Sequence, residues 1–203
     1  MNANPRADFF DAIAEKWDGW ECLTSLRQKF ATGFDAMGVN PDETVLDVGC
    51  GTGNLTGALL ARLSASGRVV AVDISPRMIE VARDKVRDER VEWHTVDASR
   101  LPLSAEQCDR VFCFSVWPHF EDPGAAAIEF RRVLKPGGQL HIWHLISRAR
   151  VNEIHATAGA AVNQDRLPPA EETGAMLGRL GFEIASLADT AEHYLVTAIK
   201  PPR

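Results

Sequence analysis

The stretch that decides the fold is VLDVGCGTG, Val45–Gly53. It is an apolar run that carries one acidic residue, Asp47, and ends in three glycines at every second position. Glycine lets the backbone approach a ligand closely and adopt positive φ. A helix expected at Asn54–Leu63 would offer free N–H groups and a positive dipole end to a ligand. The stretch therefore predicts a strand, a tight turn with a binding site, and a helix.

Outward from this stretch, apolar runs alternate with helical periods. The first 37 residues read as helix, with Phe9, Phe10, Ile13 and Trp17 at helical spacing, followed by a second segment at Leu23–Phe34. We expect strands at Val45–Val48, Val69–Val72, Val91–Val96, Arg110–Ser115, Gln139–Leu145, Phe182–Leu187 and Tyr194–Ile199. We expect further helices at Ser75–Val86, Gly124–Leu134, Arg148–Ala161 and Ala170–Leu180, and a turn at Lys135–Gly138.

The alternation of strands with helices predicts an α/β chain with a parallel sheet that is covered on both faces. The last two strands are joined only by Ala188–His193, which predicts a hairpin with one strand antiparallel to the others. In such sheets, ligands bind at the carboxyl ends of the strands. The residues that follow each strand are therefore the candidates for a site.

Composition narrows the class of protein. The chain has 203 residues and a net charge of −6, which fits one domain and argues against a large nucleic-acid footprint. Apolar runs fall short of the ~18 residues needed to cross a bilayer, and the N-terminus lacks the pattern of a signal peptide. The cysteines at 22, 50, 108 and 113 form no C-x-x-C pair and are expected to be reduced and buried. These features predict a cytoplasmic protein without a membrane segment.

Asp47 limits which ligand the glycine turn can take. A carboxylate near the turn would repel the pyrophosphate of a dinucleotide, but it suits an ammonium or sulfonium group. The dinucleotide fingerprint G-x-G-x-x-G also fails, because its sixth position is Asn54 when counted from Gly49 and Thr56 when counted from Gly51. The turn therefore favours a cationic ligand.

Acidic residues after the next two strands suit a nucleoside. Asp73 stands 20 residues beyond Gly53, where a carboxylate accepts hydrogen bonds from ribose hydroxyls. Ile74 and Met78 follow it and can cover an adenine face, and Asp97 can accept from the exocyclic amine. S-adenosylmethionine carries an ammonium, a sulfonium, a ribose and an adenine, and so fits the whole set.

Several segments together resemble the class I S-adenosylmethionine-dependent methyltransferases of the small-molecule type. VLDVGCGTG is similar to their first motif and VVAVDIS to their second. VDASRLPLSAEQCDRVFCFSVWPHF is similar to the third and fourth, and FRRVLKPGGQLHI to the approach to strand five. The resemblance covers about residues 40–145.

The resemblance implies a Rossmann-like doubly wound sheet of seven strands, the last one antiparallel, with an N-terminal helical cap whose Trp17 helps to close the site. We expect one methyltransferase domain over residues 1–203, with a cap at 1–37, a cofactor-binding core at 40–145, and substrate-side helices with a C-terminal strand pair at 146–203. The cofactor is S-adenosylmethionine, with S-adenosylhomocysteine as product. The residues expected to bind it are Trp17, Asp47, Gly49, Cys50, Gly51, Gly53, Asp73, Ile74, Met78, Asp97, Ala98 and Ser115.

Histidines gather after the fourth and fifth predicted strands. His119 lies in FSVWPHF, His144 ends the fifth strand, and His155 lies in the following helix. We expect them to form an acceptor pocket with catalytic roles for the three histidines. The candidate substrate-binding residues are Trp117, Trp143, Arg148, Asn152 and Arg166.

Three interpretations of the histidines stay open. They supply a general base for a small polar acceptor, or they hold a metal or metallocofactor, or each is structural. Their spacing is no recognised metal motif, so we predict no resident metal.

The leading hypothesis for function is methyl transfer to a small-molecule acceptor by in-line displacement. The alternatives are a non-catalytic binder of S-adenosylmethionine or S-adenosylhomocysteine, a methyltransferase acting on a metal- or metalloid-containing acceptor, and a nucleotide-dependent oxidoreductase. We expect a monomer or homodimer whose partner is a small molecule, not nucleic acid or a membrane.

Overall fold

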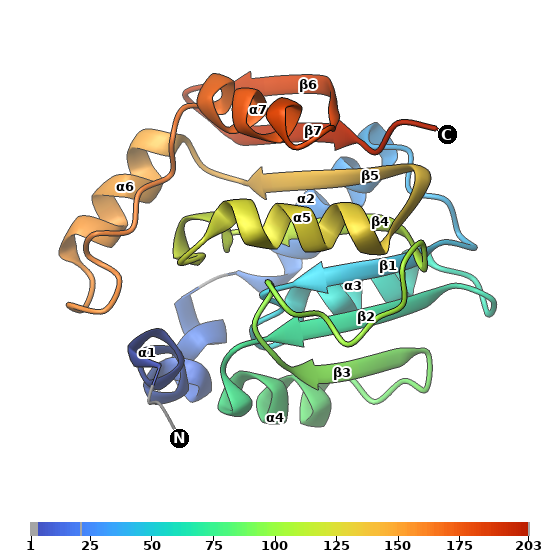
Figure 1. Cartoon of the computed structure of the whole chain (residues 1–203). Helices are drawn as coiled ribbons and strands as arrows, with labels where there is room; N and C mark the ends of the chain where they lie inside the picture. The colour runs from blue at the N-terminus through green and yellow to red at the C-terminus, as the bar shows by residue number, and fades with distance from the viewer. Residues whose placement is uncertain (1–3, 21, 203) are drawn as a thin grey trace. The chain divides into compact units, whose positions relative to one another are not determined.

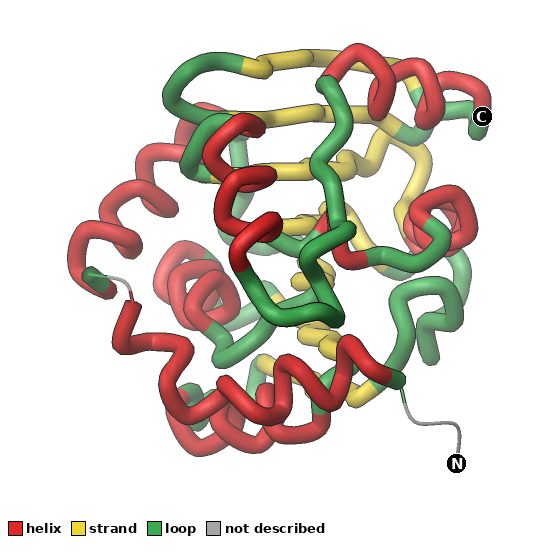
Figure 2. Tube along the Cα trace, turned by 90° about the vertical axis from the view of Figure 1, so that its left-hand side faces the viewer, coloured by secondary structure: helices red, strands yellow, loops and turns green. Residues whose placement is uncertain are grey.

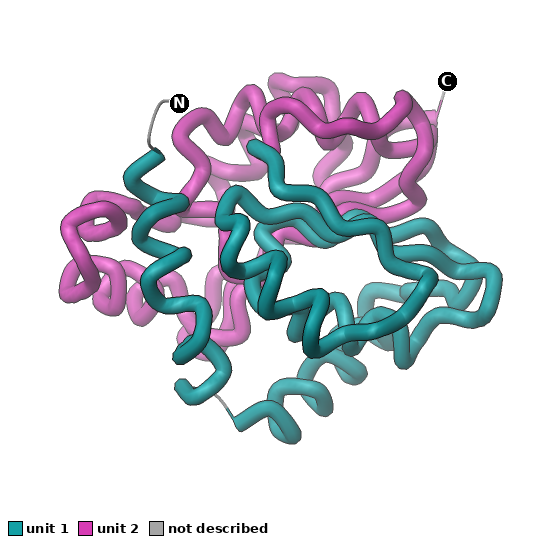
Figure 3. Tube along the Cα trace, turned by 90° about the horizontal axis from the view of Figure 1, so that it is seen from below, with its two compact units in different colours: residues 1–97 teal, residues 98–203 magenta. Residues whose placement is uncertain are grey.

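The structure is a computed structural model that describes residues 4–20 and 22–202. The chain separates into two compact units, residues 1–97 and residues 98–203 (Figure 3). The expectation of one domain over residues 1–203 stays a prediction.

Unit 1 is built on three parallel strands: β1 (Thr44–Val48), β2 (Arg68–Asp73) and β3 (Val91–Thr95). Valine dominates β1 and β2, since β-branched side chains pack well on a pleated surface. Both strands are buried almost throughout. The unit also contains the helices α2 (Leu23–Ala36), α3 (Asn54–Arg62) and α4 (Pro76–Lys85), in addition to its N-terminal helical segment.

The first of the two helical segments predicted within the first 37 residues consists of two kinds of helix in the structure. Helix α1 (Pro5–Ile13) begins at an Asn4 cap and passes at Ala14 into the 3₁₀ segment η1 (Ala14–Trp20). Helix α1 lies beside α4 (Figure 1). The apolar spacing predicts a helix, and the backbone tightens into 3₁₀ turns beyond Ile13, in the segment where Asp18 accepts hydrogen bonds from Thr52 and Asn54.

Unit 2 contains β4 (Cys108–Phe114), β5 (Leu134–His144), β6 (Glu183–Asp189) and β7 (Tyr194–Ile199). Strand β4 pairs with β5 in parallel, while β7 pairs with β5 and β6 in antiparallel fashion. The helices are η2 (Trp117–His119), α5 (Pro123–Val133), α6 (Arg148–Thr157) and α7 (Ala170–Arg179). A segment without regular structure, residues 158–169, joins α6 to α7 (Figure 2).

Two boundaries in unit 2 correct the sequence prediction. Residues 135–138, expected as a free turn, lie within β5 as an irregularity, because the register jumps from Leu134 opposite Cys108 to Gln139 opposite Arg110. The C-terminal segment pairs with this irregularity, since Gly137 N–H donates to Lys200 O at 2.8 Å. Helix α6 ends at Thr157 and not at Ala161, with Ala158 in an extended conformation.

The seven strands of the described residues follow the order β3-β2-β1-β4-β5-β7-β6. This confirms the α/β Rossmann-like sheet of seven strands, its antiparallel last strand and the helical N-terminus. The four cysteines are free thiols, and three of them are buried, but Cys22 is exposed, so its expected burial was wrong. Among the residues described, no helix combines the length and the apolar character that a membrane crossing requires.

Candidate functional site

The glycine turn of unit 1 is fastened to the end of β2 by backbone donors. Gly51 N–H donates to Asp73 Oδ2 at 2.8 Å, and Cys50 N–H donates to Val72 O at 3.0 Å. The other Asp73 oxygen accepts from Ser75 N–H at 2.9 Å. The turn and the Asp73 loop therefore form one hydrogen-bonded rim, which we call the glycine-loop rim (residues 47–56 and 73–78).

Positive φ explains why this turn needs glycine. Gly49, Gly51 and Gly53 have φ of 65°, 52° and 78°. A Cβ added at Gly53 would lie 3.2 Å from the Cβ of Ala82 and 3.3 Å from the indole of Trp93. Gly53 also caps α3 in the left-handed conformation. A side chain at Gly53 would therefore be strained and crowded at once.

Asp47 is a buried acid within the rim. It is 1% exposed, and its Oδ2 accepts from Thr56 Oγ1 at 2.6 Å. Burial raises the pKa of Asp47 from an ordinary 3.8 to about 7, and the nearby charge of Asp73 adds to the rise. A positively charged ligand would favour the ionised form, since an opposite charge stabilises a carboxylate. The buried acid thus suits the cationic ligand that the sequence predicts.

Asp73 and the residues after it differ in exposure. Asp73 is 8% exposed, and burial raises its pKa, while the N–H groups of Ser75 and Gly51 act in the opposite direction. Ile74 is half-buried, whereas Met78 is 1% exposed and belongs to the core of the unit. Of the two residues expected to cover an adenine face, Ile74 has the more accessible side chain.

Hydrogen bonds of Asp18 connect the N-terminal segment to the glycine-loop rim. Its Oδ1 accepts from Thr52 Oγ1 at 2.6 Å and from Asn54 Nδ2 at 2.9 Å, and its Oδ2 accepts from Lys85 Nζ at 2.6 Å. The pKa of Asp18 is lowered, because the hydrogen bonds from Lys85, Thr52 and Asn54 outweigh the opposing effect of burial. The neighbouring Trp17 brings its indole Nε1 to 3.9 Å from where a Cβ of Gly51 would stand.

Three further predicted cofactor residues lie outside this rim. Asp97 is exposed at the end of unit 1, and Ala98 is half-buried at the start of unit 2. Ser115 follows β4, is exposed and has a φ of 54°, and its N–H donates to Trp143 O at 2.9 Å. A positive φ on a residue other than glycine is uncommon and concentrates at functional sites. Their cofactor roles stay predictions.

In unit 2, His119, His155 and Asp165 come together. His119 Nδ1 lies 2.7 Å from Asp165 Oδ2, and His155 Nδ1 lies 3.2 Å from Asp165 O. The His119 and His155 ring centroids are 4.7 Å apart. Burial, followed by the effect of His119, lowers the pKa of His155. With His144, these residues are called the histidine cluster below (His119, His144, His155 and Asp165).

Asp165 defines which nitrogen of its two neighbours carries a proton. A carboxylate and a carbonyl oxygen only accept hydrogen bonds, so Nδ1 is the N–H atom on both His119 and His155. In each neutral ring, Nε2 then carries the lone pair and is the basic nitrogen. Asp165 is itself 5% exposed, so this arrangement is held inside the unit.

His144 is the fourth member of the cluster. It ends β5, is 2% exposed, and its ring meets Tyr194 edge-on at 5.8 Å. Burial, followed by the proximity of His119 and His155, lowers the pKa of His144 to about 3. Its Nε2 is buried without a hydrogen-bond partner among the described residues. Such an atom costs about 1–3 kcal/mol, so it calls for an explanation.

His141, three residues earlier in β5, shows the ordinary arrangement of a buried histidine. Its Nε2 lies 2.7 Å from Arg110 Nη1, and its Nδ1 lies 3.0 Å from Thr197 Oγ1. Burial also lowers the pKa of His141 to about 3. Two histidines of one strand are therefore equally buried, but only His141 has both nitrogens engaged.

The predicted substrate-binding residues have other partners. Arg148 Nε donates to Asp189 at 2.6 Å. Asn152 binds both the N–H and the carbonyl of Leu167. The exposed Arg166 donates to the carbonyls of Asn163 and Asp165. Trp117 and Trp143 are buried, packed against Phe120 and against Phe112 and Phe114, respectively.

Sequence reasoning missed Asp165 and Asp18. Asp165 lies between α6 and α7 and contacts His119 across 46 positions of the chain. Asp18 reaches Thr52 across 34 positions. Neither acid lies at a distinctive spacing from its partner, so no local signal marks them.

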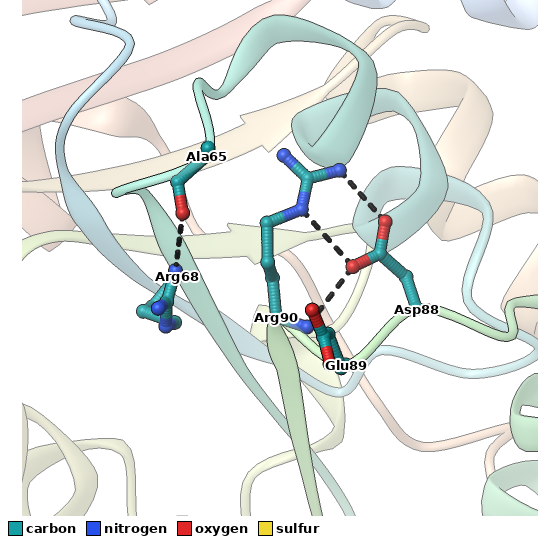
Figure 4. A pocket seen from close by; sticks show the side chains of 5 residues that line it. All are labelled: Ala65, Arg68, Asp88, Glu89 and Arg90. Carbon is teal, nitrogen blue, oxygen red and sulfur yellow. Dashed lines mark hydrogen bonds and ion pairs between the residues drawn. The ribbon is translucent and has the colours of Figure 1, made fainter.

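The described residues contain no group of three or more His, Cys, Asp or Glu side chains arranged to hold a metal ion. An open hollow elsewhere in unit 1 is lined by Ala65, Arg68, Asp88, Glu89 and Arg90 (Figure 4). These residues lie just before β2 and β3 or, for Arg68, at the start of β2, at the opposite ends of the strands from the glycine-loop rim. Arg90 and Asp88 pair with each other at 2.7 Å, and Arg68 donates to Ala65 O. These polar groups of the hollow therefore bind one another.

Comparison with known proteins identifies relatives over the central part of the chain. Residues 46–142 match the methyltransferase domain family. The ubiquinone/menaquinone biosynthesis C-methyltransferase UbiE of Idiomarina loihiensis is 34% identical over 145 residues, covering 67% of this chain and 57% of the relative. The methyltransferase GfsG of Streptomyces halstedii is 29% identical over 173 residues, covering 78% of this chain and 59% of the relative.

These curated relatives are longer proteins, and the chain spans less than two thirds of the length of each. Among solved structures, a SAM-dependent methyltransferase from Aquifex aeolicus has a TM-score of 0.77 at 22% identity, covering 94% of this chain and 98% of that one. The structural likeness at this identity establishes the fold.

Proposed function

Because these matches place the chain in the class I S-adenosylmethionine-dependent methyltransferase family, we propose that it transfers a methyl group to a small-molecule acceptor. S-adenosylmethionine, the cofactor of this family, supplies an activated methyl group that an acceptor displaces in line. Unit 1 is proposed to hold the cofactor, and the histidine cluster of unit 2 is proposed to hold the acceptor.

The observation that carries the proposal is the glycine-loop rim. Its glycines leave bare backbone where a side chain would stand, Asp73 fixes the turn, and Asp47 places a buried acid beside it. Such an acid raises the free energy of the unbound protein unless a positive group comes near it. This arrangement supports a cationic adenosine conjugate over a dinucleotide.

The histidine cluster supports a general base for acceptors that must lose a proton. Asp165 sets Nε2 as the basic nitrogen of His119 and would stabilise the imidazolium that forms after proton transfer. Positioned bases of this kind contribute about 10²–10⁴-fold to rate. His119 is thus proposed as the base and Asp165 as its positioning residue.

Calorimetry with S-adenosylmethionine, S-adenosylhomocysteine and NADH tests the cofactor proposal. We expect both S-adenosyl compounds to bind and NADH not to bind. Tight binding of NADH without binding of either S-adenosyl compound would overturn it, and would favour the oxidoreductase alternative.

A transfer assay tests the reaction itself. The protein is incubated with methyl-labelled donor and a metabolite extract, and the label is followed into small molecules. We expect transfer by the native protein and by His94→Gln, a control on the separate strand β3, and a loss of about 10²-fold or more in His119→Gln. Equal transfer by both variants would remove His119 from the chemistry.

A second candidate is a non-catalytic binder of S-adenosylmethionine or S-adenosylhomocysteine. It is favoured by the protein partners of Arg148, Asn152 and Arg166, which engage three of the groups expected to hold substrate. Binding of both S-adenosyl compounds with no transfer to any acceptor would support it. The net charge of −6 favours a small-molecule partner over nucleic acid, and the cytoplasmic location and oligomeric state stay predictions.

A further inference from the structure

We infer that the histidine cluster binds an uncharged hydroxyl group of the acceptor, and that the buried Nε2 of His144 forms a hydrogen bond with that hydroxyl. The inference deepens the proposed function, on which it depends, by naming the class of acceptor. It assigns to His144 a specificity-determining role, distinct from the base role proposed for His119.

The first argument is the contrast between two histidines of β5. The fold gives His141 partners for both ring nitrogens, at 2.7 Å and 3.0 Å. It leaves the Nε2 of His144 without one among the described residues, at 2% exposure. Buried polar atoms of folded proteins are nearly always paired. A buried nitrogen without a partner therefore indicates a place where a ligand supplies one.

The second argument is the chemistry of an imidazole nitrogen. Depending on the tautomer, Nε2 of a neutral histidine either donates or accepts a hydrogen bond. A hydroxyl group does both, so it pairs with His144 in either tautomer. A carboxylate pairs only with an N–H, and an ammonium group pairs only with a lone pair.

The third argument is charge. The Asp165 carboxylate is buried within the cluster, and it would repel an anionic acceptor. The two arginines among the predicted substrate-binding residues are engaged, Arg148 with Asp189 and Arg166 with backbone carbonyls. A cationic acceptor would have to lose its water beside an acid that already binds His119. A neutral hydroxyl avoids both penalties.

Three probes of similar size test the inference: phenol, benzoate and benzylamine. The full chain, saturated with S-adenosylhomocysteine, is labelled with ¹⁵N-histidine and titrated with each probe, and the ring nitrogen signals are followed by NMR. We expect phenol to shift the His144 signals and to bind about tenfold more tightly than the other two probes. Tighter binding of benzoate or of benzylamine, or no binding of phenol, would overturn the inference.

Variants of His144 separate recognition from packing. In His144→Phe, we expect phenol affinity to fall about tenfold while S-adenosylhomocysteine affinity and the melting temperature are not reduced, because the unpaired nitrogen is gone. His144→Gln, whose amide can take the place of Nε2, should recover part of the phenol affinity, and His94→Gln should leave it unchanged.

Unaltered phenol binding in both His144 variants would overturn the assignment. This outcome differs from failure of the proposed function, in which the native chain binds neither S-adenosyl compound. The phenol titration without the cofactor compound then still reports on the histidine cluster.

Discussion

The glycine-loop rim of unit 1 and the histidine cluster of unit 2 differ in whether their buried polar groups have hydrogen-bond partners among the described residues. In the rim, Asp73 binds the N–H groups of Gly51 and Ser75, and Asp47 binds Thr56, so the side chains hold one another. In the cluster, Asp165 holds two histidines, but Nε2 of His144 has no partner among the described residues. The carboxylates of the rim are paired within unit 1, whereas the cluster contains a buried nitrogen without a partner among the described residues.

We expect the largest change at Asp47, the buried acid of the glycine-loop rim. Its folded-state pKa of about 7 lies above the ordinary 3.8, so the folded protein binds the additional proton and loses stability as pH rises between these values. We expect Asp47→Asn to raise the free energy of unfolding at about pH 8 by about 2–4 kcal/mol. Urea unfolding at two pH values measures it.

At about pH 3, where the carboxyl is neutral in both states, native chain and Asp47→Asn should unfold alike. Asp42→Asn, a change at an exposed acid of the same unit, should show no such gain at about pH 8. A variant no more stable than the native chain at the higher pH would mean that Asp47 is not a strained acid.

The next effect concerns Asp73, which holds the rim together. We expect Asp73→Ala to weaken S-adenosylhomocysteine binding by about 1–3 kcal/mol, because Gly51 and Ser75 lose their acceptor and a ribose acceptor is lost. Calorimetry measures the change, and Asp73→Asn should be milder, since its amide oxygen still accepts. Native affinity in Asp73→Ala would show that the rim does not need this carboxylate.

The pH dependence of donor binding sharpens the contrast between the two regions. Below its pKa of about 7, Asp47 is protonated in the unbound protein and offers no negative charge to a sulfonium or ammonium group. We expect S-adenosylmethionine affinity to fall by up to about tenfold from about pH 8 to about pH 6. Asp47→Asn should remove this dependence, and an equal slope in both proteins would assign it to another group.

We expect the smallest change at Asp18, whose hydrogen bonds connect the N-terminal segment to the glycine-loop rim. Asp18 accepts from Thr52, Asn54 and Lys85, and the Lys85 contact is a partly exposed ion pair. We expect Asp18→Asn to weaken S-adenosylhomocysteine binding by about 0.5–1 kcal/mol, since Trp17 is then held less firmly over Gly51. Asp35→Asn, at an exposed ion pair of α2, is the matched control. Equal calorimetric results for the two variants would show that the contacts of Asp18 do not contribute to cofactor binding.

The fold and most of the rim could be predicted from the sequence because their determinants are local. The apolar residues of β1, the spaced glycines and Asp73 lie within 30 residues, and each follows from backbone preferences that act over a few positions. The seven-stranded sheet with its antiparallel last strand was predicted for the same reason, with differences at the 3₁₀ segment η1, at residues 135–138 and at the end of α6.

The histidine cluster could be predicted only in part, because long-range contacts decide it. The sequence suggested that His119, His144 and His155 belong together, but Asp165, which orders two of them, lies in a loop without a distinctive pattern. The same spacing reasoning assigned Asn152 to substrate, whereas its amide fastens Leu167 in the segment between α6 and α7. The residues next to a side chain in the sequence do not determine which distant residue it contacts in the fold.

The central claim is that the rim is built for a positively charged adenosine conjugate. Calorimetry of the native chain at about pH 8, with S-adenosylmethionine and NADH titrated in parallel, tests it most directly. We expect S-adenosylmethionine to bind and NADH not to bind. Binding of NADH alone would contradict it.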